Sequence, residues 1–166
     1  MPADSATPSS PDLDDSQPMR VLRQFRIVFN AVKTHFRQVE REAGLGGAQL
    51  WALSVIDRHP GIGATGLARE LDIHQSTASN LVRALVERGY VTGSREGLDR
   101  RNVALHVQPA GRAVLERAPL PFAGVLPDAL ASLDEATLQQ LEQNLECLIA
   151  QLGADEAAAR LPLSQL

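Results

Sequence analysis

Apolar side chains recur at helical spacing near both ends of the chain. Between residues 20 and 42 they alternate at steps of three and four, at Leu22, Phe25, Phe29, Val32, Phe36 and Val39. Near the other end the same spacing returns, at Leu138, Leu141, Leu145, Leu148 and Leu152. A narrow seam of this kind is typical of helices that pack along one another. The pattern predicts two long terminal helices that associate between subunits, and packing against their own domain is the alternative.

Three shorter helices are expected between the two seams, over residues of about 48–58, 64–71 and 74–88. Because proline and glycine end helices, the first stops at His59-Pro60-Gly61 and the third at Gly89. The apolar period then changes from 3.6 to two, which predicts short strands at residues 90–92 and 103–107. The expected architecture is mostly α-helical, with a small β-hairpin in the middle.

The region after the hairpin is rich in proline. Pro109 suits the first turn of another helix, because that position needs no amide donor. Pro119, Pro121 and Pro127 are expected to kink or break this helix before the last one begins. For the last helix the start signal is Ser132 with Glu135, or Asp134 as the cap.

Charge is unevenly distributed along the 166 residues, although the net charge is only −4. Residues 1–18 carry four acids and no base, and residues 113–166 carry eight acids and two bases. Residues 19–60 carry seven bases and three acids, and residues 61–112 seven bases and five acids. The middle of the chain is therefore basic between two acidic ends, so the net charge misrepresents the central surface.

The expected helix at 74–88 has two chemically different faces. Ala78, Leu81, Val82 and Leu85 form an apolar stripe that should face the core. The opposite face carries short or planar hydrogen-bonding groups and one arginine, namely Gln75, Ser76, Ser79, Asn80 and Arg83. Ser and Asn are mediocre helix formers, whereas Gln, Asn and Arg match the edges of adenine and guanine. A short helix and a tight turn precede this helix, so we interpret the pair as a helix-turn-helix whose second helix enters the major groove.

A charged loop joins the two expected strands. It contains two glycines and five charges, among them Arg95, Asp99, Arg100 and Arg101. A wing at this place could put one arginine into the adjacent minor groove, while Asp99 pairs with the other arginine. A charged, solvated turn is the alternative interpretation of this loop.

At several places the sequence resembles the MarR family of winged helix-turn-helix regulators. The resemblance is carried by Leu67-Ala68-Arg69-Glu70-Leu71, Ser76-Thr77-Ala78-Ser79, Leu85-Val86-Glu87-Arg88-Gly89-Tyr90-Val91, Asp99-Arg100-Arg101 and Pro109-Ala110-Gly111. It covers roughly residues 20–152. It implies a winged-helix DNA-binding lobe at 46–108, and a helical dimerisation lobe formed by 19–45 and 109–153. Residues 1–18 and 154–166 are then tails, the first of them flexible because it lacks apolar surface to bury.

The resemblance also implies a function and the residues that perform it. A homodimer would bind a pseudo-palindromic operator in double-stranded DNA, as a repressor that a small ligand releases. The side chains implied in the major groove are Gln75, Ser76, Thr77, Ser79, Asn80 and Arg83, with Arg100 or Arg101 in the minor groove. Members of the family often respond to aromatic or phenolic acids, which makes His35 and Trp51 candidate effector-binding residues, although a core position is the plainer interpretation of both.

Other classes of function find little support in the sequence. The four histidines are far apart and none has a partner at ligand spacing, so no metal or other cofactor is expected. No phosphate-binding loop or nucleophile elbow is present, so we do not expect an enzyme. With one cysteine, no signal peptide and no long apolar run, the expected location is the cytoplasm, away from membranes. A winged-helix protein-interaction module, and oxidant sensing through Cys147, remain the alternatives.

Overall fold

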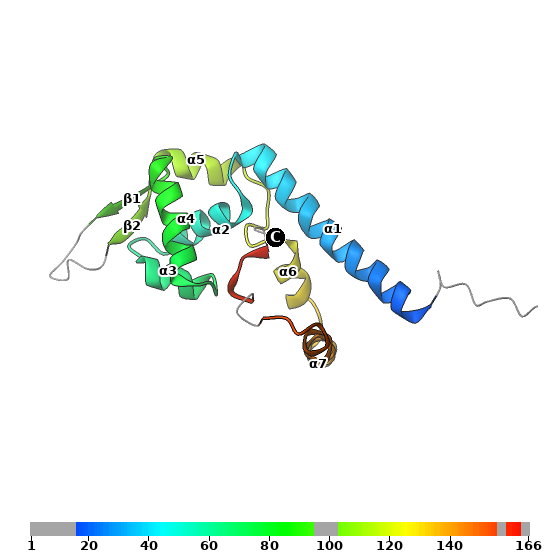
Figure 1. The fold of residues 1–166 in the computed structure, drawn as a ribbon. Helices are drawn as coiled ribbons and strands as arrows, with labels where there is room; N and C mark the ends of the chain where they lie inside the picture. The colour runs from blue at the N-terminus through cyan, green and yellow to red at the C-terminus, as the bar shows by residue number, and fades with distance from the viewer. Residues whose placement is uncertain (1–15, 95–102, 156–158, 164–166) are drawn as a thin grey trace, which may run out of the picture.

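The structure is a computed structural model in which residues 16–94, 103–155 and 159–163 are described. Over these residues the chain is mostly helical, with one antiparallel hairpin (Figure 1). The mostly α-helical fold with a small β-hairpin is therefore confirmed. The elements in chain order are α1 (Gln17–Ala43), α2 (Gly47–Arg58), α3 (Ala64–Glu70), α4 (Gln75–Glu87), β1 (Val91–Ser94), β2 (Ala104–Val107), α5 (Pro109–Arg117), α6 (Val125–Ala131) and α7 (Glu135–Leu152).

A compact core lies where α2, α3, α4, the hairpin and the start of α5 meet. Most of its largest fully buried side chains come from α2, α3, α4 and β2, and one each comes from the end of α1, the turn between α1 and α2, and the middle of α5. They are Val39, Leu45, Leu50, Leu53, Val55, Ile56, Leu67, Leu85, Leu105 and Val114. Aliphatic groups thus fill the core, as the scarcity of aromatic residues requires, and we call this region the winged-helix lobe.

Strand β2 makes backbone hydrogen bonds on both of its edges. Within the hairpin, Val91 pairs with Val107 and Ser94 with Ala104. The other edge of β2 exchanges backbone hydrogen bonds with the loop after α2, because Leu105 accepts from Gly61 at 2.8 Å and donates to Ile62 at 3.1 Å. These bonds satisfy backbone groups that an edge strand would otherwise present to solvent.

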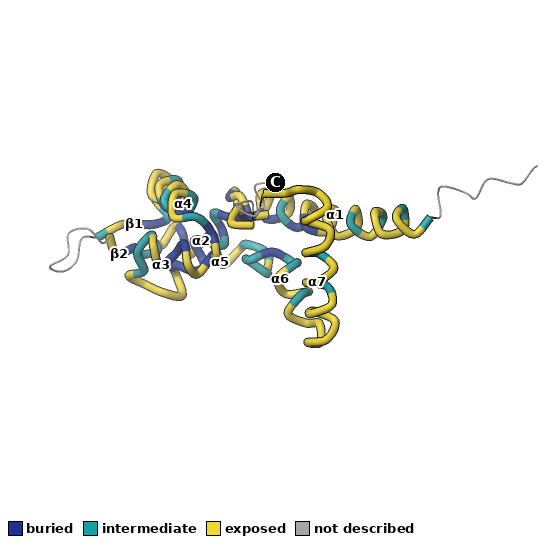
Figure 2. The backbone as a smooth tube through the Cα atoms, turned by 60° about the horizontal axis from the view of Figure 1, so that its bottom comes forward, coloured by how far each residue is buried: buried dark blue, intermediate teal, exposed yellow. Residues whose placement is uncertain are grey.

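The first half of α1 and all of α7 lie outside this lobe. In α1 the buried residues begin at Val32, and no residue of α7 is buried. Figure 2 shows the contrast, with dark blue concentrated in α2 to α5 and yellow along α7 and the start of α1. The seam of α7 and the first half of the seam of α1 therefore lie largely open in the single chain.

The proline-rich region differs from the expectation in one respect. Pro119 and Pro121 do separate two helices, since α5 ends at Arg117. However, the chain forms a further short helix, α6, and Pro127 lies in its first turn. The prediction that Pro127 breaks a helix is wrong, because the first turn tolerates a residue without an amide donor.

The start of α7 distinguishes between the two expected caps. The backbone N–H of Thr137 donates to the Asp134 carboxylate at 2.9 Å, and the Thr137 hydroxyl donates to the same group at 2.7 Å. Ser132 instead follows the last turn of α6 and donates to Ala129. The Ser132–Glu135 start signal is therefore wrong and the Asp134 alternative is confirmed.

Among the described residues, no helix is both long enough and apolar enough to cross a membrane.

Candidate nucleic-acid interface

Helix α4 presents one face to the core and the other to solvent. Ala78, Leu81 and Leu85 are buried, and they attach the helix to α2 and α3. On the outer face Gln75, Ser76, Asn80 and Arg83 are exposed, and Thr77 and Ser79 are half-buried. The two-faced helix that the sequence predicts is confirmed. Its outer face is a row of hydrogen-bonding groups with one cation near the middle of the helix.

A hydrogen bond between side chains fixes how α4 starts relative to α3. The Gln75 amide donates to the Thr65 hydroxyl at 3.2 Å. In the connecting turn, Asp72 adopts a positive φ of 50°, and the Ile73 amide donates to Ala68 at 3.0 Å. This tight turn is why the two helices meet at an angle and leave the face of α4 uncovered.

Glycine allows the chain to turn from α4 into the hairpin. Gly89 has a φ of +71°, a conformation that costs side-chain-bearing residues more than glycine. Tyr90 then donates to Leu85 at 3.0 Å, and β1 begins at Val91. Figure 1 shows the hairpin extending away from the core beside α3 and α4. The predicted wing residues Arg95, Asp99, Arg100 and Arg101 lie outside the described residues.

His35 and Trp51, the two candidate effector residues, have different surroundings. His35 is buried, its Nε2 lies 3.0 Å from the Pro121 carbonyl oxygen, and its ring meets Phe36 edge-on. Trp51 is half-buried and packs against the core, and it also lines two clefts. His35 lines neither of these clefts, so the structure does not bring the two candidates together in one site.

One of these clefts combines aromatic and charged groups. It has a volume of about 380 Å³. Trp51, Ser54 and Arg58 of α2 line one side, and Phe122 and Asp128 line another. The Arg58 Nε donates to the Ser54 carbonyl at 3.4 Å, which holds the guanidinium stem along α2. We call it the Trp51–Arg58 cleft.

Comparisons with known proteins agree with this geometry. Residues 43–102 match the model of the MarR family. A protein of Thauera aromatica, named as a transcriptional regulator for the hcr operon, is 29% identical over 87 residues, which are 52% of each chain. The match thus spans about half the length of this curated relative.

Solved structures share the fold over most of the chain. MepR of S. aureus, in a complex with DNA, has a TM-score of 0.56 at 18% identity, covering 82% of this chain and 99% of its own. A second match is BpsR of Bordetella bronchiseptica, a protein whose binding to DNA is regulated by 6-hydroxynicotinic acid. It has a TM-score of 0.52 at 22% identity, covering 78% of this chain and 98% of its own. The chain therefore shares the fold of these DNA-binding regulators, and its residues 43–102 are similar to the MarR family.

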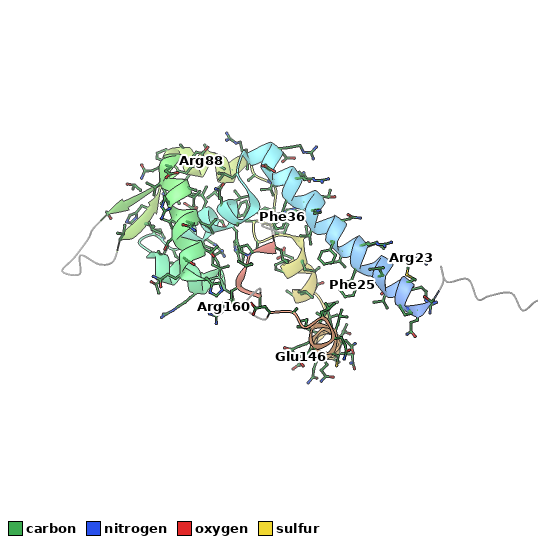
Figure 3. The ribbon with its side chains drawn as sticks, viewed as in Figure 1. Arg23, Phe25, Phe36, Arg88, Glu146 and Arg160 are labelled. Carbon is green, nitrogen blue, oxygen red and sulfur yellow. The ribbon has the colours of Figure 1, made fainter. Side chains whose placement is uncertain are left out.

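Three side chains that make hydrogen bonds in the structure were not singled out from the sequence. Thr65 accepts the hydrogen bond from Gln75, and Arg58 lies beside Trp51. Arg88 (Figure 3) donates from Nη1 to the Gly44 carbonyl at 2.7 Å, which ties the end of α4 to the end of α1. These partners are separated by as many as 44 positions in the sequence, so no local pattern predicts them.

Proposed function

We propose that the protein is a dimeric transcriptional regulator that binds double-stranded DNA and represses genes from a pseudo-palindromic operator. The single observation that carries the proposal is the outer face of α4. Six polar side chains lie there on a helix whose opposite face is anchored in the core. A rigid helix bearing Gln, Asn, Ser and Arg suits the major groove, because these groups match base edges and phosphates.

The contacts we assign follow from this placement. Gln75, Ser76, Thr77, Ser79, Asn80 and Arg83 would contact the major groove. Arg95, Asp99, Arg100 and Arg101 would form the wing, with Arg100 or Arg101 entering the minor groove. Residues 46–108 would form the DNA-binding lobe, and residues 19–45 with 109–153 the dimerisation lobe.

The open apolar seams favour a second copy as the partner for dimerisation. In α7, Leu138, Leu148 and Leu152 are 40%, 38% and 69% exposed. In α1, Leu22 and Phe29 are 41% and 57% exposed. Apolar patches of this kind mark interaction sites. A dimer would place two recognition helices about 34–36 Å apart, the spacing of one turn of DNA.

Charge supports pairing of α1 with the α7 of a second copy. The outer side of α1 carries exposed bases beside its seam, among them Lys33, Arg37 and Arg41. Helix α7 carries Glu142 and Glu146 beside its own seam and has no base. Opposite charges that flank two apolar seams steer the helices together and specify the pairing.

The test is fluorescence anisotropy with DNA from upstream of the protein's own gene and a scrambled duplex, over a series of salt concentrations. We expect the upstream duplex to bind far more tightly, with a log–log salt slope that reports several phosphate contacts. Equal, weak binding to both duplexes would contradict the proposal for this DNA and favour a protein partner for the winged helix.

Arg83→Ala tests the face of α4 directly. We expect operator affinity to fall by about tenfold or more, because a contact between arginine and a base or phosphate is lost. Arg117→Ala, at an exposed position in the last turn of α5, removes the same charge away from the proposed face. Equal effects of the two variants would contradict the assignment of α4.

We further propose that a small aromatic or phenolic acid binds in the Trp51–Arg58 cleft and releases the operator. The volume of the cleft lies in the range typical of small-molecule sites, and Trp51, Phe122 and Arg58 offer aromatic walls and a cation for a carboxylate. The probe is 4-hydroxybenzoate, titrated into the operator complex. Release that Arg58→Gln abolishes would support this site, and full DNA binding at a saturating acid concentration would contradict it for this compound.

A further inference from the structure

The C-terminal segment 159–163 forms part of the lining of a second cleft, in the middle of the molecule. This cleft has a volume of about 230 Å³ and is distinct from the Trp51–Arg58 cleft, although Trp51 and Ala123 line both. Phe36 of α1, Trp51 of α2 and Pro127 of α6 line it, together with the turn at 71–73 that connects α3 to α4. The segment itself contributes Ala159, Leu161, Pro162 and Leu163. Figure 1 shows this red segment between α6 and the winged-helix lobe.

Within the segment, Pro162 differs from its neighbours in burial. It is buried, whereas the neighbouring Leu161 and Leu163 remain 43% and 42% exposed. Proline has no backbone N–H, so its burial leaves no amide donor without a partner. Its fixed φ also reduces the conformational entropy lost when the segment docks. A Leu-Pro-Leu run is therefore well suited to covering an apolar cleft from outside.

The cleft is lined by the winged-helix lobe and by helices that lie mostly outside it. The turn at 71–73 leads directly into α4, whereas Phe36 and Pro127 belong to helices outside the winged-helix core. The segment lines the same cleft as residues from both of these parts. In Figure 3 its exposed Arg160 lies between the winged-helix lobe and α7.

We propose that residues 159–163 form a strap that covers one side of this cleft and fixes the helix-turn-helix turn against α1 and α6. When the strap leaves, the cleft becomes a binding site for a small apolar or aromatic molecule beside Trp51. Because the strap is tethered to the same chain, its effective concentration at the cleft is in the millimolar range. A free ligand binds only the open form. Its apparent affinity is therefore lowered by the factor by which the population of the closed form exceeds that of the open form.

Trp51 reports on the strap because it is the only tryptophan and lines the cleft. The variant is Pro162→Glu in the full chain, since a carboxylate is too costly to bury in an apolar cleft. We expect a red-shifted Trp51 emission, faster quenching by acrylamide, and about tenfold tighter binding of the apolar probe 1-anilinonaphthalene-8-sulfonate. The matched control is Ala154→Glu, which adds the same charge at an exposed position that does not line the cleft.

A chain that ends at Asp155 serves as the second variant and lacks the strap altogether. It should reproduce the emission, the quenching and the probe affinity of Pro162→Glu, with the same far-ultraviolet circular dichroism as the intact protein apart from the missing residues. If both variants match Ala154→Glu in all three measurements, the strap does not cover the cleft and the proposal is overturned.

The consequence for DNA rests on the proposed function. With the strap displaced, the turn before α4 is held less firmly, so operator affinity should fall several-fold in Pro162→Glu and stay unchanged in Ala154→Glu. Failure of the intact protein to bind any operator would contradict the proposed function alone, because the fluorescence of Trp51 tests the strap without DNA. An altered Trp51 signal with unchanged operator affinity would overturn the coupling of the strap to α4.

Discussion

The winged-helix lobe and the terminal helices have similar apolar spacing, but the exposure of their apolar side chains differs. In α4, Leu81 and Leu85 are four residues apart, and their exposed fractions are 6% and 0%. In α7, Leu148 and Leu152 have the same spacing, and their exposed fractions are 38% and 69%. An apolar seam thus shows that one face of a helix needs to be buried. Whether the same chain supplies the covering surface depends on the elements that lie around that helix.

This difference separates two sources of stability. The lobe buries its aliphatic groups within one chain, so its free energy of unfolding should not depend on protein concentration. The seam of α7 and the first half of the seam of α1 are not covered by the chain itself. If a second copy covers them, the resulting stabilisation rises with protein concentration. Phe25 and Phe29 of α1 illustrate the point, because their rings stack on each other at 6.4 Å and Phe29 is still 57% exposed.

The largest effect is expected from breaking the α7 seam. Leu145→Asp with Leu148→Asp places two carboxylates in the proposed dimer interface. We expect a monomer in analytical ultracentrifugation, and an operator affinity lower by about 100-fold or more, because binding at the two half-sites is no longer linked.

The control for that variant carries the same added charge on the opposite side of α7. Gln143→Asp with Ala150→Asp changes two exposed positions outside the seam. It should remain dimeric and bind the operator like the parent protein. A dimer with both leucines replaced would contradict the assignment of α7 to the interface.

The next largest effect concerns the core of the lobe. Leu85→Ala removes a fully buried side chain from α4 and should lower the free energy of unfolding by about 2–5 kcal/mol, through lost burial and the remaining cavity. Val86→Ala, one position along and 44% exposed, should cost much less. Urea denaturation at two protein concentrations checks both. An equal cost for the two variants would contradict the described packing of α4.

Local patterns in the sequence were sufficient to predict the helices other than α6, the hairpin and the two different faces of α4. Periodicity reports burial directly, and Gly89 and Pro109 mark ends of elements by their backbone chemistry. Helix α6 was missed because only seven residues in a proline-rich region form it. Contacts between distant residues, such as Arg88 with Gly44 or Pro162 in its cleft, leave no periodic signal. The exact assignment of DNA contacts to α4 and the wing stays a prediction.

A smaller effect is expected where the hairpin meets α5. A Cβ added to Gly111 would lie 2.5 Å from the Tyr90 carbonyl oxygen and 3.0 Å from Val107 Cγ1. Overpacking against backbone costs about 1–3 kcal/mol, more than the roughly 1 kcal/mol that alanine contributes in a helix. Gly111→Ala should therefore destabilise the lobe in urea denaturation. Gly46→Ala is the control, since a Cβ there meets nothing within 4 Å, and a similar loss in both would contradict the close packing at Gly111.

The smallest effect belongs to the cap of α7 and depends on pH. Hydrogen bonds from the Thr137 hydroxyl and amide hold the pKa of Asp134 below its usual range. Because the pKa of Asp134 is lower in the folded protein, its carboxylate stabilises the fold at pH values above the ordinary pKa of aspartate. This stabilisation is lost as the pH falls through the folded-state pKa. Asparagine caps as well as aspartate but does not titrate in this range. Asp134→Asn should therefore keep the melting temperature near neutral pH and flatten its decline in acid, whereas Asp134→Ala should lower it at neutral pH. Identical acid profiles for the parent and Asp134→Asn would show that this cap contributes nothing to the stability of the region that α7 forms.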